Sequence, residues 1–87
     1  MDKEIFYDVF SNRYFTMPFD EFVEHIHRIN QYIYEHRYCT LNDVYSELGL
    51  NTINVANHIE FTDRLNVILE LTEDMTSGTE VLRVFIR

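Results

Sequence analysis

The stretch from Thr40 to Ile59 constrains the fold of this chain most, because it combines helix-capping signals with one of only two glycines. Thr40 suits a helix N-cap, and Asp43, three residues later, completes a capping box. Gly49 stands where helices commonly end in a left-handed residue. A second apolar stripe after Gly49 predicts another short helix. Residues 40–59 therefore have the pattern of a helix-turn-helix, which is also the pattern of an ordinary helical corner.

Two further segments have clear periodic patterns. Pro18 suits the first turn of a helix, and apolar residues at helical spacing follow it, so we expect a long helix over residues 18–37. Alternating apolar residues predict two strands that pair as an antiparallel hairpin over residues 66–87. Ile68 and Phe85 would lie on the face of this hairpin away from the core. The predicted core consists of Phe19, Phe22, Ile26, Ile29, Ile33, Leu41, Val44, Leu48, Val67, Leu69, Leu71, Leu82, Val84 and Ile86.

Residues 2–16 fit either a helix or a hairpin. Ile5, Phe6 and Val9 begin an apolar stripe with helical spacing. The aromatic and β-branched content of the same residues favours strands. We expect a helix, because Ser11-Asn12 is a weak two-residue turn. In either form, this aromatic segment is the expected cover for Ile68 and Phe85.

Together these segments predict a single α+β domain over residues 1–87. Three to four helices, including the helix-turn-helix-like unit, would pack on the C-terminal antiparallel β-hairpin, in the element order of a winged helix. A chain of 87 residues is long enough for one modest core. Cys39 is the only cysteine, so no internal disulfide is expected and an intracellular compartment fits. No apolar run approaches the roughly 20 residues of a membrane span.

The net charge of −8 is the strongest global property of the chain. A field of this sign repels nucleic-acid phosphates and anionic membranes, and it favours partners with basic surfaces. The plainer explanation of the charge is solubility. Glu24 and His27 form a Glu-x-x-His with no second copy, which is too little for a metal site. Since there is also no phosphate-binding loop or nucleophile motif, we expect no enzymatic activity, no cofactor and no metal.

The leading hypothesis is a non-enzymatic protein that binds a host protein with a basic surface. Carboxylates gather at the start of the long helix and around the hairpin loop, and tyrosines could supply anchors. A homodimer is an alternative partner. The candidate protein-binding residues are Asp20, Glu21, Glu24, Glu73, Asp74, Glu80, Tyr32 and Tyr34.

A winged-helix DNA-binding regulator is the alternative hypothesis. The segment from Thr52 to Ile59 would then be the recognition helix, and asparagine can read adenine. Against this alternative, residues 40–59 contain no Lys or Arg to contact phosphates. The candidate DNA-binding residues are Thr52, Asn54, Asn57, His58 and Arg83.

The sequence Tyr-Cys-Thr-Leu-Asn-Asp-Val-Tyr-Ser-Glu-Leu-Gly-Leu, with Leu-Thr-Glu-Asp-Met and a closing Val-Leu-Arg-Val-Phe-Ile, resembles a family of small phage and prophage proteins of unknown function. The resemblance covers about residues 38–87. It implies a phage or mobile-element origin and action in the cytoplasm of a bacterial host. By analogy, it implies inhibition of a host or defence protein, as by anti-CRISPR inhibitors that mimic nucleic acid. A phage structural or assembly protein is the third function class.

Overall fold

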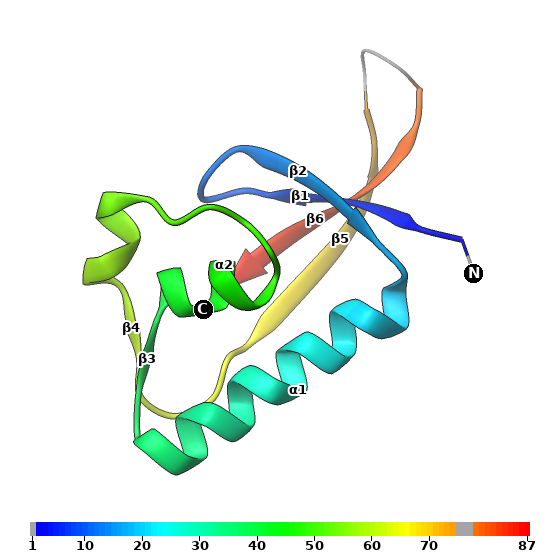
Figure 1. The fold of residues 1–87 in the computed structure, drawn as a ribbon. Helices are drawn as coiled ribbons and strands as arrows, with labels where there is room; N and C mark the ends of the chain where they lie inside the picture. The colour runs from blue at the N-terminus through cyan, green and yellow to red at the C-terminus, as the bar shows by residue number, and fades with distance from the viewer. Residues whose placement is uncertain (1, 75–77) are drawn as a thin grey trace. The chain divides into compact units, whose positions relative to one another are not determined.

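The computed structural model describes residues 2–74 and 78–87, and these form two compact units (Figure 1). The sheet unit comprises Met1–Phe19 and Asn66–Arg87, and the helical unit comprises Asp20–Leu65. The first unit is therefore built from the two ends of the chain. The expectation of a single domain over residues 1–87 stays a prediction.

Four strands in the order β2-β1-β6-β5 form the sheet unit. Two antiparallel hairpins, β1–β2 and β5–β6, meet where β1 runs parallel to β6. In this parallel pair Phe6 lies opposite Leu82 and Asp8 opposite Val84. The first and last strands of the chain thus form the centre of a mixed sheet. The strands are β1 (Glu4–Asp8), β2 (Arg13–Met17), β5 (Val67–Glu73) and β6 (Glu80–Ile86).

The expectation of a helix near the N-terminus is wrong, and the hairpin alternative describes residues 4–17. The turn between β1 and β2 has four residues, Val9–Asn12, in place of a two-residue turn at Ser11-Asn12. Asp8 is buried, and its carboxylate accepts hydrogen bonds from the backbone N–H and the hydroxyl of Ser11. Asn12 has a φ of 56°, a left-handed conformation that asparagine tolerates well. These two side chains make the turn that the dipeptide alone does not predict.

The N-terminal aromatic segment does not act as a cover for the C-terminal hairpin. It extends the sheet sideways, because β1 pairs with β6 edge to edge. Ile68 remains 45% exposed. Phe85 is half-buried, and the guanidinium of Arg83 lies 5.2 Å from the centre of its ring.

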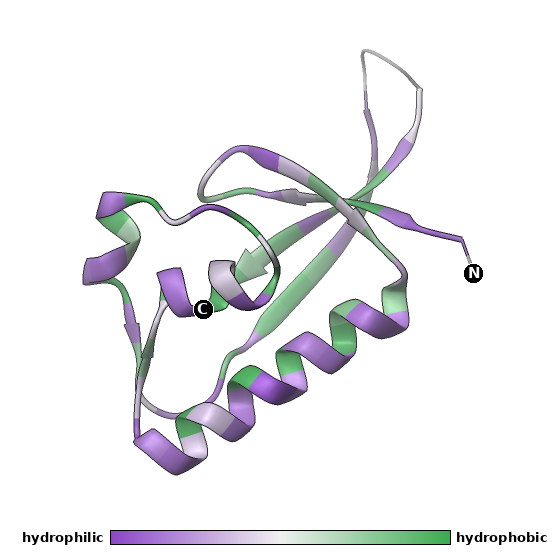
Figure 2. Cartoon of the chain, viewed as in Figure 1, coloured by the Kyte–Doolittle hydropathy of each residue, from purple (hydrophilic) through white to green (hydrophobic). Residues whose placement is uncertain are grey.

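The helical unit contains the long helix α1 (Phe19–His36), which starts directly after Pro18. Hydrophobic and hydrophilic residues alternate along α1, as expected for a helix with one buried side (Figure 2). Phe22, Ile29 and Ile33 form its buried side. The other elements of this unit are β3 (Cys39–Thr40), α2 (Leu41–Glu47), the 3-10 helix η1 (Asn54–His58) and β4 (Glu60–Phe61), with β3 antiparallel to β4.

Helix α2 has both of the caps that its sequence predicts. The Thr40 hydroxyl accepts a hydrogen bond from the Asp43 N–H, and the Asp43 carboxylate accepts one from the Thr40 N–H. At the other end Gly49 has a φ of 82°. The N–H groups of Gly49 and Leu50 donate to the carbonyls of Ser46 and Tyr45. This is the Schellman arrangement, in which a left-handed residue closes the helix.

The expected fold class is wrong in its helices. Within residues 2–74 and 78–87 there are two α-helices, and the second half of the helix-turn-helix-like unit is a five-residue 3-10 helix, η1. Asn, Thr and β-branched residues dominate this segment and are weak helix formers. The carboxamide of Asn42 also donates to the Ile53 carbonyl at 2.7 Å and accepts from the Ile53 N–H at 2.9 Å. The chain is therefore α+β, with a four-stranded mixed sheet in place of a C-terminal hairpin that carries a helix bundle.

The predicted core is partly wrong. Phe19 is 47% exposed and Leu71 is 62% exposed. Several buried side chains were not predicted, and in the sheet unit they come mainly from the N-terminal hairpin. The buried members of the predicted core are Phe22, Ile29, Ile33, Leu41, Val44, Leu48 and Val84, and the unpredicted ones are Phe6, Met17, Cys39, Tyr45, Ala56, Phe61, Leu65 and Val81.

Candidate functional site

A groove in the helical unit, between α1 and α2, is the best candidate for a binding site. Its volume is about 360 Å³. Ile29 contributes an apolar wall, and Tyr32 contributes an aromatic ring that is 41% exposed. The remaining lining residues are Arg28, Asp43, Ser46 and Glu47. We call this hollow the α1–α2 groove.

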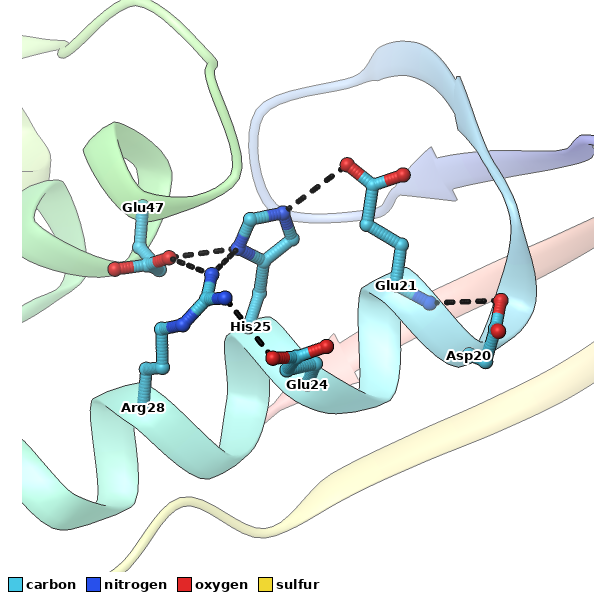
Figure 3. A network of polar contacts seen from close by, with 6 residues as sticks. All are labelled: Asp20, Glu21, Glu24, His25, Arg28 and Glu47. Atoms are coloured by element: carbon cyan, nitrogen blue, oxygen red, sulfur yellow. Dashed lines mark hydrogen bonds and ion pairs between the residues drawn. The ribbon is translucent and has the colours of Figure 1, made fainter.

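A network of charged side chains flanks the groove and joins the two helices (Figure 3). Nδ1 of His25 lies 2.6 Å from Oε2 of Glu47, which comes from α2. Arg28 lies 3.0 Å from Glu24, one turn earlier on α1, and 3.5 Å from the same Glu47 oxygen. Nε2 of His25 lies 3.7 Å from Glu21. Three carboxylates thus surround one arginine and one histidine.

The geometry defines the role of His25. A carboxylate only accepts hydrogen bonds, so the 2.6 Å contact requires a proton on Nδ1 of His25. The 3.4 Å approach of Arg28 to the same nitrogen is then a contact between two protonated atoms. Since both ring nitrogens face carboxylates, His25 is not directed at a nucleophile as a general base would be. The arrangement is suited to holding α1 against α2 and to presenting negative charge.

The predicted protein-binding residues on α1 divide between two sides of the helix. Glu21 and Glu24 carry side chains that are 56% and 64% exposed, and both belong to the network. Tyr32 lines the groove and stacks on His36, with ring centres 4.1 Å apart. Tyr34 is 74% exposed, but two residues along a helix correspond to about 200°, so it lies away from Tyr32.

Asp20 stands in the first turn of α1. Its carboxylate accepts a hydrogen bond from the Glu21 N–H at 3.1 Å. Asp20 is exposed and directly precedes Glu21, the first residue of the network.

The other predicted carboxylates belong to the sheet unit. Glu73 and Glu80 lie opposite each other, where β5 ends and β6 begins. Asp74 follows directly, and the hydroxyl of Tyr14 donates to its carboxylate at 3.4 Å. Partial desolvation and this carboxylate raise the pKa of Tyr14. A second hollow, of about 350 Å³, is lined here by Tyr7, Tyr14, Thr72, Asp74, Val81 and Arg83.

The candidate DNA-binding residues are divided between the two units. Thr52 precedes η1, whereas Asn54 and His58 are its exposed ends. The carboxamide oxygen of Asn57 accepts a hydrogen bond from Asn42 at 2.7 Å, so it is engaged in the fold. Arg83 belongs to the sheet unit and lies 3.0 Å from Glu70.

Sequence reasoning assigned no role to four residues of this site, and it gave Asp43 a role only as a helix cap. The four residues are His25, Arg28, Ser46 and Glu47. Glu47 and Asp43 are four residues apart on α2, which places them on one side of that helix. That spacing could have indicated an acidic side of α2, but only the structure shows that this side faces α1.

A comparison with protein-family models matches residues 1–61 to DUF6353, a family of unknown function. The chain belongs to this family. The matched residues include the N-terminal hairpin, α1, α2 and the whole α1–α2 groove. The DUF6353 match corrects the extent of the expected resemblance, since it includes the first 37 residues and stops before β5. Neither a curated protein nor a solved structure matches the chain.

Two kinds of feature are absent from the part of this DUF6353 member that the structure describes. No cluster of three or more His, Cys, Asp or Glu side chains in residues 2–74 and 78–87 could hold a metal ion. No described helix has the length and apolar character that crossing a bilayer requires.

Proposed function

We propose that this DUF6353 member binds a host or defence protein through the α1–α2 groove and inhibits or modulates that partner without catalysis. The observation that carries the proposal is the gathering of carboxylates from two helices beside an exposed aromatic ring. Glu24 and Glu47 contact Arg28, and Glu21 contacts the neighbouring His25. Tyr32 forms part of the groove itself. A partner that inserts a lysine or arginine would meet both charge and a π-face.

The charge of the helical unit supports a basic partner. Residues 20–65 contain eight acidic and three basic residues, so this unit carries most of the net charge of the chain. Complementary charge raises the association rate and selects against acidic partners. The groove adds the aromatic contact that typically anchors an interface.

The biological setting is part of the same proposal. The resemblance to small phage and prophage proteins supports a phage or mobile-element origin and action in the cytoplasm of a bacterial host. Within that setting an anti-CRISPR-like inhibitor is the favoured form. Mimicry of nucleic acid would make a DNA duplex compete with this protein for the partner.

The test replaces Asp20, Glu21 and Glu24 by lysine in one variant. We expect this triple variant to lose the partner that the wild type captures from a nuclease-treated bacterial lysate, because it reverses the charge beside the groove. The control variant replaces Asp2, Glu60 and Asp63 by lysine, which changes the net charge equally at exposed sites outside α1 and α2. Binding of the purified partner should weaken with salt.

A partner that binds both triple variants equally would contradict the proposal. Loss of binding in both would show that only net charge matters and would also contradict it. Competition by a DNA duplex distinguishes mimicry from other inhibition at the same site. Tyr32→Ala tests the groove itself and should weaken the complex without changing its dependence on salt.

A further inference from the structure

The strand β5 has an open backbone edge. It is last in the sheet order β2-β1-β6-β5, so within the described residues only β6 pairs with it. Asn66 exchanges both backbone hydrogen bonds with Arg87 at 2.9 Å, and Asp74 donates to Thr79 at 2.8 Å. Because bonded and non-bonded pairs alternate along an antiparallel ladder, the even-numbered residues from 66 to 74 face β6. The N–H and C=O groups of Val67, Leu69, Leu71 and Glu73 therefore point outward.

The two edges of the sheet differ in their protection. At one edge β2 is five residues long and is followed directly by Pro18. Short length and a nearby proline are common ways of keeping an edge strand from pairing. At the other edge β5 has seven residues and contains neither proline nor lysine. Its first half is hydrophobic, with Ile68 45% exposed, and further along Leu71 is 62% exposed (Figure 2).

We propose that a second copy of this chain occupies this edge, with β5 antiparallel to β5 of the partner copy and a two-fold axis at Leu69. In this dimer the four-stranded sheets of the two copies would join through their β5 strands into one continuous sheet. This inference is independent of the proposed function, because it concerns the sheet unit alone.

The side chains of β5 select this arrangement. With the axis at Leu69, this residue meets its own copy and Val67 meets Leu71, so apolar side chains lie opposite each other. On the other face Ile68 meets Glu70 of the partner copy. Three of the four outward residues, Val67, Leu69 and Leu71, would exchange about six backbone hydrogen bonds, two for each bonded pair. Such a self-complementary contact is what a two-fold dimer requires.

Neighbouring arrangements are less favourable. An axis at Glu70 would set this carboxylate opposite its own copy in a close, non-bonded pair, and Val67 opposite Glu73. An axis at Leu71 would set Leu69 opposite Glu73. Like charges directly opposite each other destabilise a sheet. Charge thus disfavours the axis at Glu70, and the axis at Leu71 would lose the Val67–Leu71 pairs. The net charge of −8 on each copy opposes association at low salt.

The test measures mass in solution by sedimentation, with the wild-type chain across micromolar concentrations and at two salt concentrations. We expect a dimer whose affinity rises with salt, which is the opposite of the response expected for a basic partner. Leu69→Pro removes an N–H that points away from β6, so it should leave the sheet folded while weakening the dimer more than about tenfold. Leu69→Val keeps the N–H and an apolar side chain and should keep the dimer.

Single cysteines then locate the axis, in a background in which Cys39 is replaced by alanine. Leu69→Cys should form a covalent dimer under mild oxidation faster than Glu70→Cys or Leu71→Cys. This measurement also decides the matter if Leu69→Pro fails to fold. A wild type that stays monomeric, a folded Leu69→Pro variant that stays dimeric, or faster crosslinking at Glu70 or Leu71 would each overturn the proposal. The triple lysine variant at Asp20, Glu21 and Glu24 tests partner binding at the groove and does not bear on the dimer. The two proposals can therefore fail independently.

Discussion

The two units of the molecule are stabilised in different ways. In the helical unit, polar side chains determine the local path of the backbone, as the Thr40–Asp43 cap and the Asn42 carboxamide show. In the sheet unit, backbone ladders join residues from opposite ends of the chain, with Phe6 opposite Leu82. Substitutions should therefore act through apolar packing in the sheet unit and through lost hydrogen bonds in the helical unit.

The largest expected effect comes from the core of the sheet unit. Phe6 is fully buried, and its ring stacks on Phe15 with centres 5.1 Å apart. Phe6→Ala should lower the free energy of unfolding by about 3–5 kcal/mol, because it removes this packing and leaves a cavity beside the ring of Phe15. Urea unfolding would measure the loss. Phe10→Ala is the matched control, since Phe10 is 49% exposed, and an equal loss in both variants would contradict the packing argument.

The next largest effect tests the polar clamp of the helical unit. Asn42→Ala would leave the N–H and C=O groups of Ile53 without the side chain that now pairs with both. The Ile53 carbonyl would still accept from the Ala56 N–H at 3.1 Å, so the cost comes mainly from the unpaired Ile53 N–H, and we expect a loss of about 2 kcal/mol. Hydrogen exchange should accelerate at the Ile53 amide, whereas the exposed Asn54→Ala should behave as the wild type. Unchanged exchange at Ile53 would show that the clamp is not what fixes this segment.

The same contrast explains how much of the fold could be predicted from the sequence. The cap at Thr40, the left-handed Gly49 and the start of α1 after Pro18 depend on a few neighbouring residues, and the sequence indicates them. The sequence indicates the N-terminal hairpin only as the less favoured alternative, because its turn depends on the buried Asp8 carboxylate, which a dipeptide rule ignores. The pairing of β1 with β6 was missed because no local pattern specifies which distant strand a segment joins.

For the candidate site, too, the sequence indicates what lies within one helix and not what two helices bring together. Helical spacing placed Glu21 and Glu24 on one part of α1, and the structure includes both in the charged network. The contribution of Glu47 depends on the packing of α2 against α1, so sequence could not reveal it. The segment expected to be a recognition helix is the short 3-10 helix η1. The Asn57 carboxamide oxygen accepts a hydrogen bond from Asn42, a contact that spacing along the chain does not indicate, and the role of Asn57 in DNA binding stays a prediction.

A smaller effect is expected at the helix cap. Thr40→Ala removes the hydroxyl that accepts from the Asp43 N–H at 3.2 Å, and it should cost about 1 kcal/mol. Thr40→Ser should restore most of this stability, because it keeps the hydroxyl. Thermal unfolding of both variants and of the exposed Thr62→Ala would check the prediction. A double-mutant cycle with Asp43→Ala should show that the two residues are coupled, and additive losses would contradict the capping box.

The smallest expected effect is a dependence on pH that arises from the buried thiol of the helical unit. Burial, and then the charge of Asp43, raises the pKa of the Cys39 thiol from 9.0 to about 11. Between these values the unfolded chain loses this proton while the folded chain keeps it, so the folded state binds more protons and stability falls as pH rises. At pH 9.5 the fall should be smaller than the loss in Thr40→Ala. The Cys39→Ala variant lacks the thiol but has every other titrating group of the wild type. The difference in urea midpoint between the wild type and this variant, measured from pH 8 to 10, therefore reports the effect of the thiol alone. A difference in midpoint that stays constant from pH 8 to 10 would show that the thiol ionises equally in the folded and unfolded states. The buried cysteine would then not contribute to the pH dependence of the helical unit.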